Sequence, residues 1–206
     1  MKEQGILNSL IAKFPGVINS RYPFPSPFIG NGKIKAIVLG ADPTHIVNEK
    51  PKQLDKVFGL DKPKSPYWRS IQGNLDGLIL SMDNIYVQNL CRNYFTKETS
   101  KNKYWKQIAR DYWAPFLKKE LDERFDTNVP VLMTTEFILH SVLTDPKRKL
   151  EAKTIYKEKI VIPKEENLLG RDLIAFYRHY KYSLTLPKWK GYKEFISARV
   201  YSNGRL

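Results

Sequence analysis

Asp42 is the first side chain in this sequence whose position suggests chemistry. It follows an apolar run over residues 34–39 that is rich in β-branched residues and is stopped by Gly40. Such a run predicts a buried strand of a parallel sheet, and ligands gather at the carboxyl ends of these strands. The pair Asp42-Pro43 also fits a plain turn that caps the next helix. This stretch alone favours the turn.

Asn89 ends a second stretch of this kind. Residues 84–90 are β-branched and aromatic, which predicts a strand. A side-chain amide at the end of a strand can donate and accept hydrogen bonds together, as the recognition of a base edge requires. Amides in turns and helix caps are commoner, so the sequence leaves both interpretations open.

A third candidate is the segment 176–182, which reads Phe-Tyr-Arg-His-Tyr-Lys-Tyr. Aromatic rings alternating with cations suit stacking on bases and pairing with phosphates. The same alternation is typical of a helix with one buried face and basic side chains that reach out to water. The two interpretations have equal weight.

The charge of the chain points to a polyanionic partner. The 206 residues include 35 Lys and Arg against 21 Asp and Glu, a formal net charge of +14. We expect nucleic acid before a membrane surface, although a solvated basic surface has the same composition. No apolar run is long enough to span a bilayer, and the first residues lack the apolar core of a signal peptide.

Cysteine and histidine usage limits the chemistry further. Cys91 is the single cysteine, which excludes an intrachain disulfide and a cysteine-ligated zinc or iron–sulfur site. One cysteine is typical of a reducing cytoplasm, where we expect the protein to act. His45, His140 and His179 lack the spacing of metal ligands, so we expect no metal and no organic cofactor.

Periodicity predicts the elements that must position these residues. Helices are expected over residues 5–14, from 65–66 to 79, over 105–121 with a bend or break at Pro115, and over 136–142 and 189–196. Strands are expected over 34–39, 84–90, 129–134 and 159–162, and an exposed loop over 164–171. This alternation predicts a single domain, residues 1–206, with the fold of a three-layer α/β/α sandwich around a largely parallel four-stranded sheet.

The order of several short motifs between residues 22 and 185 resembles that of the uracil-DNA glycosylase superfamily. Gly40-Ala41-Asp42-Pro43-Thr44-His45 resembles the water-activating loop of that family, Gly-Gln-Asp-Pro-Tyr-His. Phe58 falls where the family places the aromatic ring that stacks on uracil, and Asn89 where an Asn reads the pyrimidine edge. Three further segments are similar: 64–71 to the family's Pro-Pro-Ser-Leu segment, Trp105 to the Trp that begins a helix, and 178–180 to an Arg-His-Phe.

Two departures from the family pattern bear on activity. The family's His-Pro-Ser motif should follow the fourth strand, where the predicted strand at 159–162 is followed by Pro163-Lys164 instead. Thr44 replaces an aromatic residue that blocks the thymine methyl group. Three outcomes stay open: an altered base preference, a different acid such as Lys164 or His179, or a loss of catalysis.

The resemblance implies a DNA repair hydrolase that flips a uracil-type or related pyrimidine out of DNA and cleaves its glycosidic bond. Its alternative is a catalytically inactive module that binds DNA or a flipped base. A flavodoxin-like nucleotide-binding domain is disfavoured, because no Gly-rich phosphate loop is present. DNA is the expected partner of a monomer. The residues implied are Asp42, His179 and Lys164 for catalysis, Ala41, Thr44, Phe58 and Asn89 for the base, and Ser65, Leu168, Leu169, Arg171 and Arg178 for DNA.

Overall fold

The computed structural model describes residues 2–47, 50–61, 66–78 and 80–202, and its centre is a mixed sheet. Within this part of the chain the sheet has six strands in the order β2-β6-β3-β8-β10-β9. The four central strands, β6, β3, β8 and β10, run parallel to one another, and the edge strands β2 and β9 run antiparallel. The bounds are β2 Phe28–Ile29, β3 Ala36–Gly40, β6 Ile85–Asn89, β8 Val131–Met133, β9 Val161–Ile162 and β10 Leu173–Ala175.

The largely parallel sheet is therefore confirmed, but the predicted set of four strands is wrong in one member. The strand expected at 159–162 is β9, a two-residue antiparallel edge strand. The fourth parallel strand is β10, which pairs with β8 in the register Leu173↔Val131 and was not predicted. All residues of the four parallel strands are buried, which explains why three of them appear as short apolar runs.

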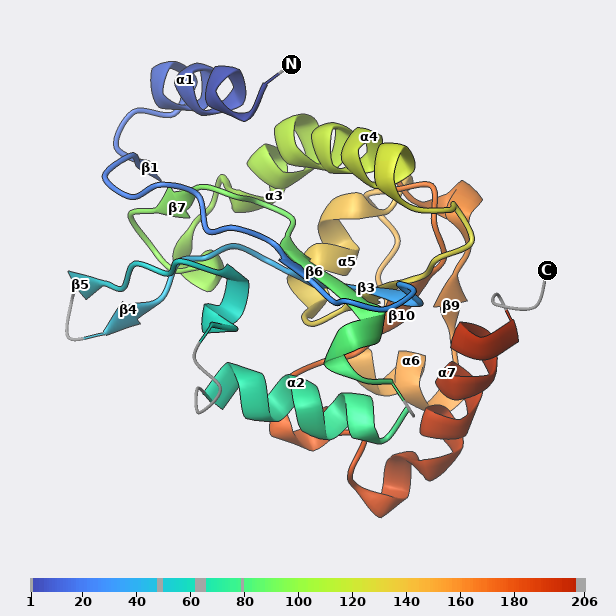
Figure 1. Ribbon diagram of the computed structural model, residues 1–206. Helices are drawn as coiled ribbons and strands as arrows, with labels where there is room; N and C mark the ends of the chain where they lie inside the picture. The colour runs from blue at the N-terminus through green and yellow to red at the C-terminus, as the bar shows by residue number, and fades with distance from the viewer. Residues whose placement is uncertain (1, 48–49, 62–65, 79, 203–206) are drawn as a thin grey trace.

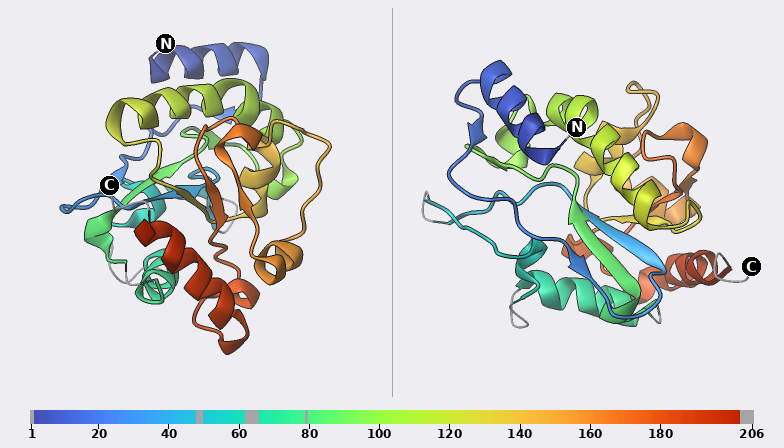
Figure 2. Two further views of the ribbon diagram at one scale, coloured as in Figure 1. Left: turned by 90° about the vertical axis from the view of Figure 1, so that its right-hand side faces the viewer. Right: turned by 45° about the horizontal axis from the view of Figure 1, so that its top comes forward.

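Helices lie on both sides of this sheet (Figures 1 and 2). Helices α1 and α4 lie on one side, and α2 and α7 on the other. The helices are α1 Glu3–Lys13, α2 Pro66–Asp76, α3 Trp105–Ile108, α4 Ala114–Arg124, α5 Glu136–Val142, α6 Ala152–Glu158 and α7 Lys190–Ser202. None of the described helices is long and apolar enough to cross a membrane.

The long helix predicted over 105–121 is split, as Pro115 suggested. A π-helical turn, η4 (Ala109–Trp113), separates α3 from α4, and Pro115 lies in the first turn of α4. Proline is tolerated there because the first N–H groups of a helix have no partner within it.

The remaining described elements are short. Strands β1 (Ile18–Asn19) and β7 (Tyr94–Phe95) form one antiparallel pair, and β4 (Ile46–Val47) and β5 (Lys50–Pro51) form another. Single 3₁₀ turns occur at η1 Val57–Gly59, η2 Met82–Asn84, η3 Thr99–Lys101, η5 Lys164–Glu166, η6 Tyr180–Tyr182 and η7 Pro187–Trp189. The turn η1 lies within the long connection between β3 and β6, where it places Phe58.

Candidate functional site

Phe58 and Asn89 meet at the end of the central strand β3. A Cβ atom placed on Gly40, the last residue of β3, would lie 2.3 Å from Oδ1 of Asn89 and 2.4 Å from Cζ of Phe58. Only glycine therefore fits at this position. The structure brings together two of the predicted base-binding residues, although 31 residues separate them along the chain.

The side chain of Asn89 is buried with an unused acceptor. The residue is 1% exposed, and its Oδ1 has no hydrogen-bond partner among the residues that the structure describes. Its backbone N–H donates to Oε1 of the neighbouring Gln88 at 2.9 Å. A buried carbonyl without a partner costs about 1–3 kcal/mol, so this amide is a polar group whose retention needs an explanation.

Phe58 is held in an unusual backbone conformation. Its φ of +60° lies in the left-handed region, which a non-glycine residue adopts at an energetic cost. The ring is buried, and the guanidinium carbon of Arg178 lies 5.4 Å from the ring centroid. The strained backbone of Phe58 persists because the surrounding structure holds its ring, which approaches Gly40 and lies under the guanidinium of Arg178.

The carboxylate of Asp42 is enclosed by three donors. Oδ1 accepts the backbone N–H of Thr44 at 2.8 Å, and Oδ2 accepts the Thr99 hydroxyl at 2.5 Å and the indole N–H of Trp105 at 2.8 Å. Burial raises the pKa of the Asp42 carboxyl above its ordinary value, and the hydrogen bonds oppose that shift. The buried Cys91 thiol lies near this carboxylate, and burial followed by the charge of Asp42 raises the pKa of Cys91.

Two further residues of the Asp42 loop have backbone partners. The hydroxyl of Thr44 accepts the N–H of Phe95 at 2.8 Å, and the carbonyl of Ala41 accepts the N–H of Cys91. These bonds tie the loop to the segment that follows β6. The roles of Thr99 and Trp105 as partners of Asp42 were not predicted, because the bonds span 57 and 63 residues.

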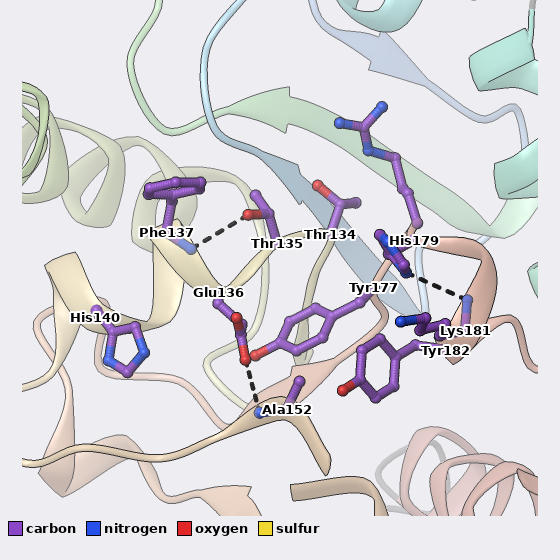
Figure 3. A pocket seen from close by; sticks show the side chains of 11 residues that line it. Thr134, Thr135, Glu136, Phe137, His140, Ala152, Tyr177, His179, Lys181 and Tyr182 are labelled. Atoms are coloured by element: carbon purple, nitrogen blue, oxygen red, sulfur yellow. Dashed lines mark hydrogen bonds between the residues drawn. The ribbon is translucent and has the colours of Figure 1, made fainter. Parts of the chain in front are cut away.

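A cavity of about 740 Å³ opens beside this edge of the sheet (Figure 3). It is lined by residues after β8, by α5 and by the segment after β10: Thr134, Thr135, Glu136, Phe137, His140, Ala152, Tyr177, Arg178, His179, Lys181 and Tyr182. Asp42, Phe58 and Asn89 are not among its lining residues. Arg178 connects the two places, because it lines the cavity and also covers the ring of Phe58.

His179 lies in the segment that follows the fourth parallel strand. The predicted position of that strand put Lys164 there, and the sheet topology corrects this. The side chain of His179 is exposed, and its Nδ1 accepts the backbone N–H of Lys181 at 3.3 Å. The ring lies 4.6 Å from that of Tyr180.

The loop expected to be exposed at 164–171 lies at the opposite end of the parallel strands from Asp42 and Asn89, where these strands begin. Because β9 is antiparallel to β10, the chain between them meets the end where the parallel strands begin. Lys164 is therefore not near Asp42 or Asn89, and its predicted catalytic role is wrong. Leu168 is half-buried against the core and Leu169 is fully buried, so neither is a wedge for DNA.

Arg171 is likewise not a DNA contact, because its side chain is 0% exposed. Its guanidinium donates to the carbonyl oxygens of Leu121 at 2.9 Å, Phe125 at 2.7 Å, and Asp126. These carbonyls belong to the end of α4 and the turn after it, where helical carbonyls lack partners. The predicted contact Ser65 lies outside the described residues.

Among the described residues, no group of three or more His, Cys, Asp or Glu side chains could hold a metal ion. Comparison of the chain with models of known protein families gives no match, and comparison with curated proteins gives none either.

Proposed function

We propose that this chain is a DNA glycosylase-like hydrolase with a three-layer α/β/α sandwich of the uracil-DNA glycosylase type. Its substrate is a flipped uracil-type or related pyrimidine in DNA. The observation that carries the proposal is the buried Oδ1 of Asn89, which has no hydrogen-bond partner among the described residues and approaches Gly40 together with the Phe58 ring. A pyrimidine ring needs such an amide for its edge and an aromatic ring for its face.

Asp42 is the group that we assign to bond cleavage. Breaking the glycosidic bond leaves a sugar with oxocarbenium character, which a carboxylate stabilises while it positions the attacking water. Asp42 follows β3 by two residues, and the donors Thr44, Thr99 and Trp105 fix the orientation of its carboxylate. Burial makes an ionised carboxylate a stronger electrostatic partner for a developing cation.

His179 is the donor that we assign to the leaving base. It follows the fourth parallel strand, where the resemblance places the catalytic histidine of the family. Its side chain lines the cavity beside Arg178, and Arg178 in turn contacts Phe58. A donor at this place would stabilise the negative charge that the base acquires as the bond breaks.

The charge of +14 supports DNA as the partner of this chain. The single cysteine, buried and reduced, is typical of a reducing compartment. We propose that the protein acts in the cytoplasm, and that it acts as a monomer.

The test is incubation with labelled oligonucleotides that contain uracil, thymine opposite guanine, xanthine or hypoxanthine, followed by alkaline cleavage of abasic sites. We expect product on at least one substrate, and the Asp42→Asn variant should lose base release while it still binds DNA. Single-stranded and duplex forms of each substrate are needed. No product on any of them would contradict the enzymatic proposal.

The second candidate is a base-binding protein without catalysis. It is favoured by the occupation of both Asp42 carboxylate oxygens by hydrogen-bond donors of the chain itself. Under this alternative, wild-type protein binds a uracil-containing strand and releases no base, and Asn89→Ala weakens that binding.

A further inference from the structure

The cavity beside Arg178 is the first of three neighbouring hollows. It shares Phe137 and His140 with a neighbouring hollow of about 440 Å³. That hollow shares Lys101, Asn102 and Lys103 with a third one of about 320 Å³. Hollows that share lining residues are neighbours, so the three follow one another from the segment after β10, past α5, to the segment 96–104, and together we call them the trough.

The walls of this trough are strongly basic. The cationic side chains that line it are those of Lys97, Lys101, Lys103, Lys106, Arg178 and Lys181. Glu136 is the acidic group that lines it, and one of its oxygens accepts the backbone N–H of Ala152. Glu98 lies beside the trough and pairs with Lys101 at 3.0 Å. The excess of positive charge suits a chain of phosphates.

Phe137 stands where the two larger hollows meet. It is 45% exposed, although large apolar side chains are usually buried, and its ring lies at the margin of the lining residues drawn in Figure 3. The ring of Trp105 supports it from the side, with centroids 6.1 Å apart. An exposed ring on a rigid support, flanked by cations, is the arrangement on which an unpaired base stacks.

Two buried donors at the walls make no hydrogen bond to the residues that the structure describes. The hydroxyl of Tyr177 is enclosed in the wall of the first cavity, with the residue 3% exposed, and it lies beside the carboxylate of Glu136 (Figure 3). The side-chain nitrogen of Asn102 is buried, although the residue as a whole is half-buried, and it has no hydrogen-bond partner among the described residues; Asn102 lines both the second and the third hollow. Such groups persist where a ligand or ordered water completes their hydrogen bonds.

We propose that this trough binds single-stranded DNA, with Phe137 as a stacking platform and the lysines of residues 97–106 as phosphate contacts. The proposal deepens the proposed function, since it specifies the strand that leads to the site at Gly40, but binding to the trough does not require bond cleavage. A ring that serves as a stacking platform needs the open face of a base, which an unpaired base offers and a base stacked within a duplex does not.

The first experiment measures the binding of fluorescein-labelled oligothymidylate of 4, 8 and 12 nucleotides by fluorescence anisotropy, beside a hairpin duplex. We expect tighter binding of the longer single strands than of the hairpin. The Phe137→Ala variant should bind the 12-mer at least tenfold more weakly, because one stacked base is lost. Phe137→Trp keeps a platform and should bind like the wild type.

The matched control is Ile11→Ala, which removes an equally exposed apolar side chain from α1 and should leave binding unchanged. Equal affinity of Phe137→Ala and wild type would overturn the assignment of the platform. Equal affinity for hairpin and single strand would overturn the assignment of the ligand.

The second experiment replaces the lysines. The triple variant Lys101→Gln, Lys103→Gln, Lys106→Gln should lower the salt dependence of 12-mer binding, with a slope of log K against log salt smaller by about 2. The control changes three exposed lysines that do not line the trough, Lys119, Lys147 and Lys188, to Gln. Equal changes in the two triple variants would mean that the effect is one of net charge and would overturn the proposal.

These outcomes separate the two proposals. If no base is released but Phe137→Ala weakens binding of the strand, the trough stands and the enzymatic function fails. If base is released and every trough variant binds the strand like wild type, the trough fails and the enzymatic function stands.

Discussion

The guanidinium carbon of Arg178 lies 5.4 Å from the centroid of the Phe58 ring. The two residues come from segments that follow different parallel strands, and their contact connects the Gly40 site with the cavity beside α5. The cation lies over the ring on which, in the proposed function, a pyrimidine stacks. A bound base must therefore displace it or share the ring with it.

Replacing Arg178 should separate base binding from strand binding. In Arg178→Ala we expect free uracil to bind about two- to fivefold more tightly, because a cation–π contact of about 0.5–1 kcal/mol no longer competes for the ring. Binding of an oligonucleotide should weaken, since a cation is lost. Saturation-transfer NMR with uracil and anisotropy with the oligonucleotide measure the two effects. Lys181→Ala is the control, and an equal change in uracil affinity there would contradict the prediction.

Gly40→Ala tests the close approach of Asn89 and Phe58. The added methyl group would lie 2.3 Å from Oδ1 of Asn89 and 2.4 Å from Cζ of Phe58, so both side chains must shift. We expect a loss of about 1–3 kcal/mol in the free energy of unfolding, measured by urea denaturation. Gly73→Ala in α2 is the control, because the nearest atom there lies at 3.9 Å. It should stabilise by about 0.5–1 kcal/mol, and an equal loss in the two variants would refute the close approach.

The buried carboxyl of Asp42 should make stability depend on pH in a defined direction. Burial raises its pKa in the folded protein from the ordinary value of 3.8. The folded protein then binds this proton more tightly than the unfolded chain does, so the wild type loses stability as pH rises from about 3.8 through the raised pKa. Asp42→Asn lacks this loss. Urea denaturation between pH 4 and pH 7 should show the stability of Asp42→Asn improving relative to wild type as pH rises, and a constant difference would contradict the raised pKa.

Arg171 should be important for stability and irrelevant to DNA. Arg171→Ala leaves the carbonyls of Leu121, Phe125 and Asp126 without their donor and opens a cavity. We expect a loss of about 3 kcal/mol or more in the free energy of unfolding. Arg124→Ala, a change at an exposed arginine at the end of α4, should cost less than about 1 kcal/mol. A smaller salt slope of DNA binding in folded Arg171→Ala would restore the original assignment to DNA.

His179 and Lys164 can be compared directly as candidates for the acid. In the proposed function, His179→Gln should lower the rate of base release about 10²–10³-fold and leave DNA binding within a few fold. Lys164→Gln should leave the rate unchanged, because Lys164 lies at the end of the sheet where the parallel strands begin. Single-turnover assays on the preferred oligonucleotide measure both, and a loss with Lys164→Gln alone would reverse the assignment.

The sequence by itself determined the central strands and the residues that end them. The apolar runs that became β3, β6 and β8 are recognisable because strands buried on both faces need continuous apolar residues. Gly40 and Asn89 end their strands as predicted, and α5 has the predicted bounds Glu136–Val142. Parallel pairing of β3 with β6 then brings Gly40 opposite Asn89. Two residues that end neighbouring parallel strands lie at the same end of the sheet, so the ends predicted from the sequence already indicate that the two residues are close.

The tertiary structure alone decided which strand is the fourth and which edge each loop occupies. Leu173–Ala175 is too short for its periodicity to identify it, and it becomes a strand because β8 offers it hydrogen bonds on one side and β9 on the other. That pairing puts His179 at the carboxyl ends of the parallel strands, and it puts Lys164 at their amino ends. It also places Arg171 where the end of α4 presents carbonyls without partners, so a cation that looks solvent-exposed in the sequence is buried by bonds to residues 45–50 positions away. Hydrogen bonds over such separations depend on the packing of the whole chain, which local composition does not encode.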